Sequence, residues 1–221
     1  MNSRTKDLIS IMNNRMYQYE FLQTIFNEPL SKEFLQKWKE RVPAEFESSD
    51  EYFSDFYNEL LAYDTDTIYE QEKEQYLQLF FGPEHIPAPP WESVYRTKER
   101  LLFGEPTLKF RSKLRDFNLY FDQENKQPED HISIELEFMT FLINLSLKAV
   151  ENEKEDEFRG LLDYQLLMLE DHLMNWMEPF TNDIISSTKS SLYKGTASLL
   201  RDYIIQDFQY LIEIKEVISH E

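Results

Sequence analysis

The sequence is poor in two residue types that many functional sites require, because it has no cysteine and only four glycines. The absence of cysteine excludes disulfides, thiol catalysis and metal sites built from thiolates. There is no glycine-rich phosphate loop and no nucleophile elbow, and four glycines are too few to build either. No apolar run approaches the roughly 18 residues of a membrane helix, and the first residues lack the apolar segment of a signal peptide. We therefore expect a cytoplasmic protein without membrane insertion.

Positive charge is also scarce. Lysine and arginine total 23 against 42 aspartates and glutamates, which gives a formal net charge of −19. Phosphate binding needs clustered cations, so this balance excludes nucleic acid and anionic membranes as expected partners. It favours a cationic ligand, whose encounter with the protein it would accelerate. Plain solubility is the alternative explanation of the same charge.

Apolar residues recur at steps of three and four along most of the chain, the period of amphipathic helices, and strand-like alternation appears nowhere for long. Ser31 and the pair Ser48 and Glu51 have the spacing of helix N-terminal caps. The sequence therefore predicts an all-α fold, a single helical globule of about ten helices. The helices are expected over Leu8 to Phe26, Phe34 to Trp38, Phe53 to Leu61, Asp66 or Thr67 to Gly82, Ser93 to Phe103, Pro106 to Phe117, Pro128 to Leu145 and Phe158 to Trp176. Pro179 and the apolar residues from Leu192 to Leu211 suggest a final pair of helices.

Residues 118–127 are polar and predict a connection between two lobes. The chain is expected to form one domain over 1–221, with an N-terminal lobe of about 1–120 and a C-terminal lobe of about 128–221. Pro128, Glu129 and Asp130 fit the first turn of the long helix that follows, where carboxylates complement the positive helix end.

The segment from Tyr76 to Tyr95 reads YLQLFFGPEHIPAPPWESVY and is the most informative stretch. Gly82 is expected to form a left-handed helix cap, and the prolines that follow stiffen the loop that leads to Trp91. A rigid loop that presents an aromatic side chain is typical of a recognition surface. The other interpretation is that Trp91 folds back into the core, since large aromatic side chains are mostly buried.

Several motifs in the middle of the chain, in their order, resemble the TorD/DmsD family. They are Tyr76-x-x-Leu79-Phe80-x-Gly82, Pro89-Pro90-Trp91-x-Ser93-Val94-Tyr95, Leu102-Phe103-Gly104 and Pro128-Glu129-Asp130-His131. A weaker similarity follows at His172-Leu173-x-x-Trp176. The tryptophan after the paired prolines is most similar to the dimethyl-sulfoxide-reductase branch. Glu92 departs from this pattern, because a small residue is expected there.

The resemblance implies a cytoplasmic chaperone that matures molybdenum-containing reductases before their twin-arginine export. Its partners would be a twin-arginine leader peptide and the apo form of a molybdoenzyme of the dimethyl-sulfoxide-reductase type. It also implies no covalent chemistry, no required cofactor, weak guanine-nucleotide binding, and a monomer with occasional domain-swapped dimers. The residues placed on or supporting the leader-binding pocket are Tyr76, Leu79, Phe80, Gly82, Pro90, Trp91, Ser93, Gly104, Asp130 and His131.

The residue chemistry fits such a pocket. An export leader carries paired arginines followed by an apolar stretch, so its binder needs an apolar groove with an acid at one end. Leu79, Phe80 and Trp91 can supply apolar area, Asp130 can accept hydrogen bonds from a guanidinium, and His131 can make a polar contact. Gly82 and Gly104 are expected to meet backbone requirements.

Two other functions remain open. His131 and Glu135 are four residues apart on one helix face, a spacing compatible with a metal-dependent enzyme. No third ligand is obvious in the sequence, so no metal site is predicted, and His172 and Trp176 are expected in the core because they continue an apolar stripe. The second alternative is a generic helical adaptor without preference for a leader.

Overall fold

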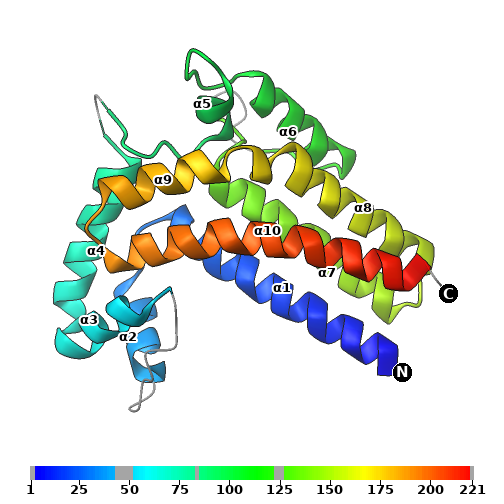
Figure 1. Ribbon diagram of the computed structural model, residues 1–221, viewed down its shortest axis with the longest axis horizontal. Helices are drawn as coiled ribbons and strands as arrows, with labels where there is room; N and C mark the ends of the chain where they lie inside the picture. The colour runs from blue at the N-terminus through cyan, green and yellow to red at the C-terminus, as the bar shows by residue number, and fades with distance from the viewer. Residues whose placement is uncertain (1–2, 43–51, 83–84, 122–126, 220–221) are drawn as a thin grey trace. The chain divides into compact units, whose positions relative to one another are not determined.

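The computed structural model describes residues 3–42, 52–82, 85–121 and 127–219. These residues form ten α-helices, one 3-10 helix and no strand, so the all-α prediction is confirmed (Figure 1). None of the helices in these ranges is long and apolar enough to span a bilayer. The helices are α1 (Ser3–Asn27), α2 (Lys32–Arg41), α3 (Ser54–Ala62), α4 (Thr65–Phe80), α5 (Glu92–Arg96), α6 (Glu105–Asp116), α7 (Ile132–Glu151), α8 (Glu155–Asp171), η1 (Leu173–Asn175), α9 (Met177–Ser187) and α10 (Ser191–Ser219).

The helix starts follow the capping chemistry of the sequence, with one correction. Ser31 caps α2 and accepts a hydrogen bond from the Phe34 N–H at 3.1 Å, as predicted. Helix α4 is capped by Asp64, whose Oδ1 accepts from the Thr67 N–H at 2.9 Å, so the predicted caps at Asp66 or Thr67 were wrong by two or three residues. The predicted capping box of Ser48 and Glu51 lies outside the described residues.

The end of α4 differs from the expectation, because Gly82 is not in the left-handed conformation and no described glycine has a positive φ. Phe81 ends the helix with extended backbone, at φ −131°. A residue that precedes a proline, as Gly82 does, is pushed towards extended conformations, and this competes with a left-handed cap. The proline-rich loop then returns to the helix, since the Ala88 N–H donates to the Leu79 carbonyl at 3.1 Å.

Two other predicted helices are shorter than expected. Helix α5 ends at Arg96, and the following turn includes positive φ angles at Arg100 and Phe103. The predicted continuous stripe from Phe158 to Trp176 is interrupted at His172, whose φ and ψ of −121° and −86° end α8 and begin η1. Apolar periodicity continues across the interruption, so it does not reveal the break.

The described chain contains two compact units, and neither follows the predicted lobes of about 1–120 and 128–221. Unit 1 consists of Met1–Gln23, Trp91–Met177 and Tyr203–Glu221, and unit 2 of Thr24–Pro90 and Glu178–Asp202. Each unit therefore combines distant stretches of sequence. Residues 118–121, at the start of the predicted connection, lie inside unit 1 and not at a boundary between units.

Unit 1 has a hydrophobic core built on α1, α7, α8 and the C-terminal part of α10. Helices α7 and α8 are joined by the short connection 152–154 and pack against each other (Figure 1). A buried ion pair links α1 to α10, where the Arg15 Nη2 atom lies 2.9 Å from Asp207 Oδ2 and the Tyr19 hydroxyl donates to the same oxygen at 2.7 Å. The two helices are thus fixed in register by a buried polar contact.

Unit 2 is held together largely by aromatic rings. Phe80 lies at its centre, with ring centroids 6.0 Å from Phe26, 5.0 Å from Tyr76, 6.3 Å from Phe180 and 5.8 Å from Tyr193. Edge-to-face and tilted rings at these distances stabilise a core beyond the apolar area that they bury.

Candidate functional site

Asp130 is the structural centre of the candidate site, which lies in unit 1. Its Oδ2 accepts a hydrogen bond from the Ser93 N–H at 2.6 Å, and its Oδ1 accepts one from the Thr107 hydroxyl at 2.7 Å. Its backbone carbonyl accepts from the Glu92 N–H at 3.0 Å. One residue thereby joins the start of α5, the first turns of α6 and the segment before α7.

This geometry corrects the expected role of Asp130. The residue has no exposed surface, and both carboxylate oxygens receive donors from the protein. Helix α7 begins at Ile132, so Pro128, Glu129 and Asp130 precede it and are not in its first turn as predicted. The carboxylate instead satisfies a backbone N–H at the start of α5, where negative charge is also favoured by the helix dipole. Burial raises the pKa of Asp130 above its ordinary value, although the two hydrogen bonds lower it in part.

Trp91 and His131 lie side by side as a direct consequence of these bonds. They form an isolated antiparallel bridge, and their rings meet edge to face with centroids 5.4 Å apart. Both residues are partly exposed. Trp91 therefore follows neither of the two sequence interpretations completely, since it is neither a free aromatic anchor nor a buried core residue.

His131 is fixed as the N-terminal cap of α7. Its Nδ1 accepts a hydrogen bond from the Ser133 N–H at 3.2 Å and lies 2.8 Å from the Ser133 hydroxyl. Burial lowers the pKa of His131 to about 4, which keeps the imidazole neutral at physiological pH. Nδ1 is thus occupied as an acceptor, and the Nε2–H remains as the group that could donate to a ligand.

Gly104 meets a steric requirement of the same region and not the backbone requirement that was expected, since its φ is −73°. It precedes α6, and a Cβ atom at this position would lie 2.8 Å from Cγ2 of Thr97 and 3.6 Å from Cβ of Ser93. Ser93 itself is buried. A larger residue at position 104 would therefore push against the turn that follows α5 and disturb the segment next to Trp91.

The other five predicted residues belong to unit 2. Tyr76, Leu79 and Phe80 are at most 2% exposed and form part of its core, Pro90 is buried, and Gly82 is exposed at the end of α4. The Tyr76 hydroxyl donates to the Phe26 carbonyl at 3.2 Å. These contacts give the three α4 residues a core role within their unit, and whether they also contact a leader stays a prediction.

A group of buried polar residues next to Trp91 was not predicted as a site. Glu92 contacts Arg96 through Oε1, and its Oε2 lies 2.7 Å from Nδ1 of His172. Glu135 accepts a hydrogen bond from Nε1 of Trp176 at 3.2 Å. His172 and Trp176 are fully buried, so the prediction that they lie in the core is confirmed. The sequence marked Glu92 as a departure from the family pattern and Glu135 as a metal-compatible neighbour of His131, but nothing in it placed either residue beside His172.

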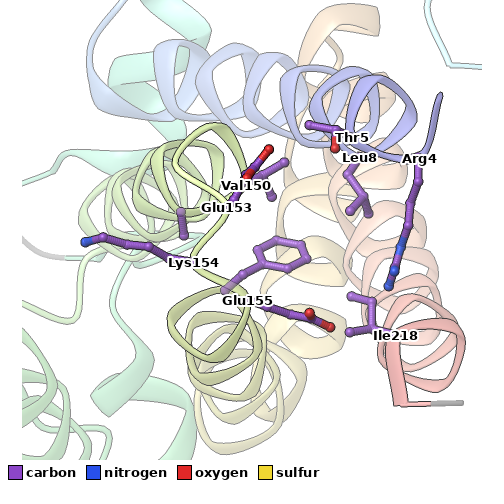
Figure 2. A pocket seen from close by; sticks show the side chains of 10 residues that line it. Arg4, Thr5, Leu8, Val150, Glu153, Lys154, Glu155 and Ile218 are labelled. Carbon is purple, nitrogen blue, oxygen red and sulfur yellow. The ribbon is translucent and has the colours of Figure 1, made fainter. Parts of the chain in front are cut away.

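Unit 1 has a pocket of about 310 Å³ near its helix ends, and it contains none of the predicted site residues. Figure 2 shows Leu8, Val150 and Ile218 around its interior, with Arg4 and Glu155 at its edge. Its charged residues include both signs and no histidine. The pocket thus mixes apolar and charged side chains and shares no residue with the predicted site.

Comparison with known proteins identifies the family. A model of the nitrate reductase delta subunit family matches residues 34–182. The chain is 31% identical to the chaperone protein TorD of Aliivibrio fischeri over 132 residues, which is 60% of each chain. It is 31% identical to the Tat proofreading chaperone DmsD of Salmonella typhimurium over 124 residues, 56% of this chain and 54% of that protein.

The aligned segments cover less than two thirds of the length of these curated relatives. A solved structure of a redox enzyme maturation protein from Archaeoglobus fulgidus is 20% identical, with a TM-score of 0.48, and the match covers 86% of this chain and 93% of that one. The resemblance deduced from the motifs is confirmed by the family match, which spans more than half of the sequence. The chain therefore belongs to the nitrate reductase delta subunit family, the family of the TorD and DmsD chaperones.

Proposed function

We propose that this protein is a cytoplasmic maturation chaperone that binds the twin-arginine leader of an immature molybdopterin reductase until the cofactor is inserted. The observation that carries the proposal is the pair of Trp91 and His131, partly exposed and fixed side by side by the buried Asp130. The names of the relatives describe chaperones, one of them a proofreading chaperone for Tat substrates. The client is proposed to be of the dimethyl-sulfoxide-reductase type, on the basis of the tryptophan after the paired prolines.

In this proposal Trp91 supplies a rigid aromatic surface and His131 a hydrogen-bond donor through its Nε2–H. Asp130 acts by positioning both residues and does not itself contact the leader. The net charge of −19 attracts the paired arginines over a longer range. An enzyme centred on His131 and Glu135 is less well supported, because the group of metal-compatible side chains in the described ranges includes Glu135 but not His131.

Replacing Trp91 with alanine should weaken binding of a twin-arginine leader peptide by about 1–3 kcal/mol, or roughly 5- to 150-fold in Kd. A partly exposed aromatic anchor contributes mainly to binding, so the melting temperature should change much less than in a core variant. Calorimetric titration and thermal melting of the same samples measure both quantities. Tyr17→Ala is the matched control, because Tyr17 is 62% exposed on α1 of the same unit.

Equal leader affinity in Trp91→Ala and Tyr17→Ala would contradict the proposed site. Equal affinity of wild type for the leader and for a scrambled peptide of the same composition would instead indicate a generic adaptor.

The association rate of the leader should fall by about tenfold as salt rises from low to physiological concentration, while the dissociation rate changes less. Long-range attraction acts on the encounter, and salt screens it. Stopped-flow measurements with the natural leader, and with a leader whose arginines are replaced by glutamine, separate this effect from general salt dependence. If the association rates of both peptides were equally insensitive to salt, the net charge would not attract the leader and would serve solubility alone.

A further inference from the structure

The Trp91–His131 pair offers little of the apolar surface that an export leader requires. Leu79 and Phe80, which were expected to supply that surface, are at most 2% exposed in unit 2. The pair itself presents one aromatic ring and one hydrogen-bond donor. Because a leader continues from its arginines into an apolar stretch, its binder needs a further apolar surface within reach of Trp91.

Unit 1 has such a surface between α5 and α6 and on α6 itself. Leu101, Leu102 and Phe103 are 60%, 43% and 41% exposed. Leu108, one turn into α6, is 57% exposed, and these four residues are called the apolar patch below. In the described ranges no other run of three large apolar residues is exposed. Single exposed apolar side chains are common, whereas a group of them indicates an interaction surface.

The backbone of the apolar patch is held in an uncommon conformation. Arg100 and Phe103 have φ angles of 51° and 59°, in the left-handed region that residues other than glycine rarely adopt. Hydrogen bonds fix the start of the patch, since the Arg100 N–H donates to the Thr97 carbonyl at 3.2 Å and the Leu101 N–H to the Thr97 hydroxyl at 3.1 Å. Backbone strain that the surrounding structure maintains is found most often at ligand sites.

The buried Asp130, which fixes the Trp91–His131 pair, also holds the start of the apolar patch. Its Oδ2 accepts from the Ser93 N–H, and the Ser93 carbonyl accepts from the Thr97 hydroxyl at 2.7 Å. The same hydroxyl oxygen receives the Leu101 N–H. A continuous chain of hydrogen bonds therefore connects the carboxylate to the patch.

The other carboxylate oxygen of Asp130 holds the far end of the patch. Oδ1 accepts from the hydroxyl of Thr107, which directly precedes Leu108. Helices α5 and α6 pack against each other, and the five residues of α5 rise about 7 Å (Figure 1). An extended peptide of five or six residues is about 17–20 Å long, so one leader can contact the pair and the patch together.

The charges beside the apolar patch favour one direction of the bound leader. Between residues 96 and 109 the chain has four basic and two acidic residues, although the whole protein has a formal charge of −19. Lys98 and Arg100, immediately before the patch, are exposed. Positive charge there disfavours the paired arginines and tolerates an uncharged apolar stretch. The leader should therefore bind with its arginines away from the patch.

We propose that Leu101, Leu102, Phe103 and Leu108 bind the apolar stretch of the export leader, next to the contact that its preceding residues make with Trp91. This inference rests on the proposed function, because it extends the surface that recognises the leader. It makes the apolar patch the part of the protein that selects leaders by their apolar residues. The arginines alone would not be sufficient for full affinity.

The first test compares two synthetic leaders by calorimetric titration of the full chain. One has paired arginines followed by leucine and alanine residues, and the other has serine in place of the leucines. Leu101→Ser should weaken binding of the apolar leader by about 10- to 30-fold and that of the serine leader by no more than about twofold. Leu61→Ser is the matched control, because Leu61 is 51% exposed on α3 of unit 2 and should bind both leaders like wild type. Both variants replace exposed residues and should melt close to wild type.

Photocrosslinking locates the apolar stretch independently of affinity. Trypsin cleaves after lysine and arginine, so residues 101–109, between Arg100 and Phe110, form one peptide that contains the whole apolar patch. A photoreactive phenylalanine analogue within the apolar stretch of the leader should label this peptide. The same group placed before the arginines should label other peptides, as mass spectrometry of the digest would show.

The proposal is overturned if Leu101→Ser binds the apolar leader as tightly as Leu61→Ser does, or if the peptide 101–109 is not labelled. If Trp91→Ala still weakens binding in that case, the proposed function stands without the patch. If wild type binds the leader no better than a scrambled peptide, both fail. A second copy of the chain would be the true occupant if Leu101→Ser lost self-association in analytical ultracentrifugation while its leader affinity was unchanged, and this result would also overturn the proposal.

Discussion

Phe80→Ala is expected to lower the free energy of unfolding by about 3–5 kcal/mol, the usual cost of truncating a buried phenylalanine. Phe80 is 2% exposed and packs against Phe26, Tyr76, Phe180 and Tyr193 within unit 2. Removing its ring would leave a cavity between rings contributed by four separate stretches of chain. Denaturant unfolding followed by far-ultraviolet circular dichroism measures the loss.

The neighbouring phenylalanine provides the control. Phe81 is 58% exposed, so Phe81→Ala should change the stability by about 0.5 kcal/mol or less. The folded fraction of Phe80→Ala should still bind the leader like wild type, since its ring is part of the core. The core assignment fails if Phe80→Ala is as stable as Phe81→Ala but loses leader binding, because Phe80 would then be the interface anchor that the motif also allowed.

The fold class could be predicted from the sequence because helical periodicity is a local property. Stripes such as Leu8 to Phe26 bury one face wherever the helix lies, and Ser31 caps its helix with a donor only three residues away. The breaks were harder to predict. His172 ends α8 inside an unbroken apolar stripe. The division of α1 and α10 between two units depends on contacts between residues almost 200 positions apart, such as Arg15 and Asp207.

Part of the candidate site could also be predicted, because its motifs are local patterns in the sequence. The motifs pointed to Trp91, Asp130 and His131, and the structure brings these three residues together. The sequence could not show that the Asp130 carboxylate accepts hydrogen bonds from the Ser93 N–H and the Thr107 hydroxyl, because these donors lie in α5 and α6. Nor could it place Glu92 against His172, because 80 residues separate them and no local pattern relates their side chains.

Asp130→Ala is the variant expected to affect stability and function together. It removes two hydrogen bonds to a charged group, each worth about 1.5–3 kcal/mol, so the free energy of unfolding should fall by about 3–6 kcal/mol. Thr107→Val removes only one of these bonds and should cost about 1–3 kcal/mol. Asp171→Ala removes an exposed acid and should stay within about 0.5 kcal/mol of wild type.

Leader binding then separates a positioning role from a direct contact. If Asp130 positions Trp91 and His131, replacing the leader arginines with lysines should weaken binding to wild type and to Asp130→Asn by the same factor, because neither protein contacts a guanidinium at this residue. A direct contact would make the lysine leader much worse for wild type than for Asp130→Asn, since lysine cannot form the two-pronged bond to a carboxylate. A coupling above about 1 kcal/mol in this double-mutant cycle would rule out the positioning role and would require the buried carboxylate to become exposed when the leader binds.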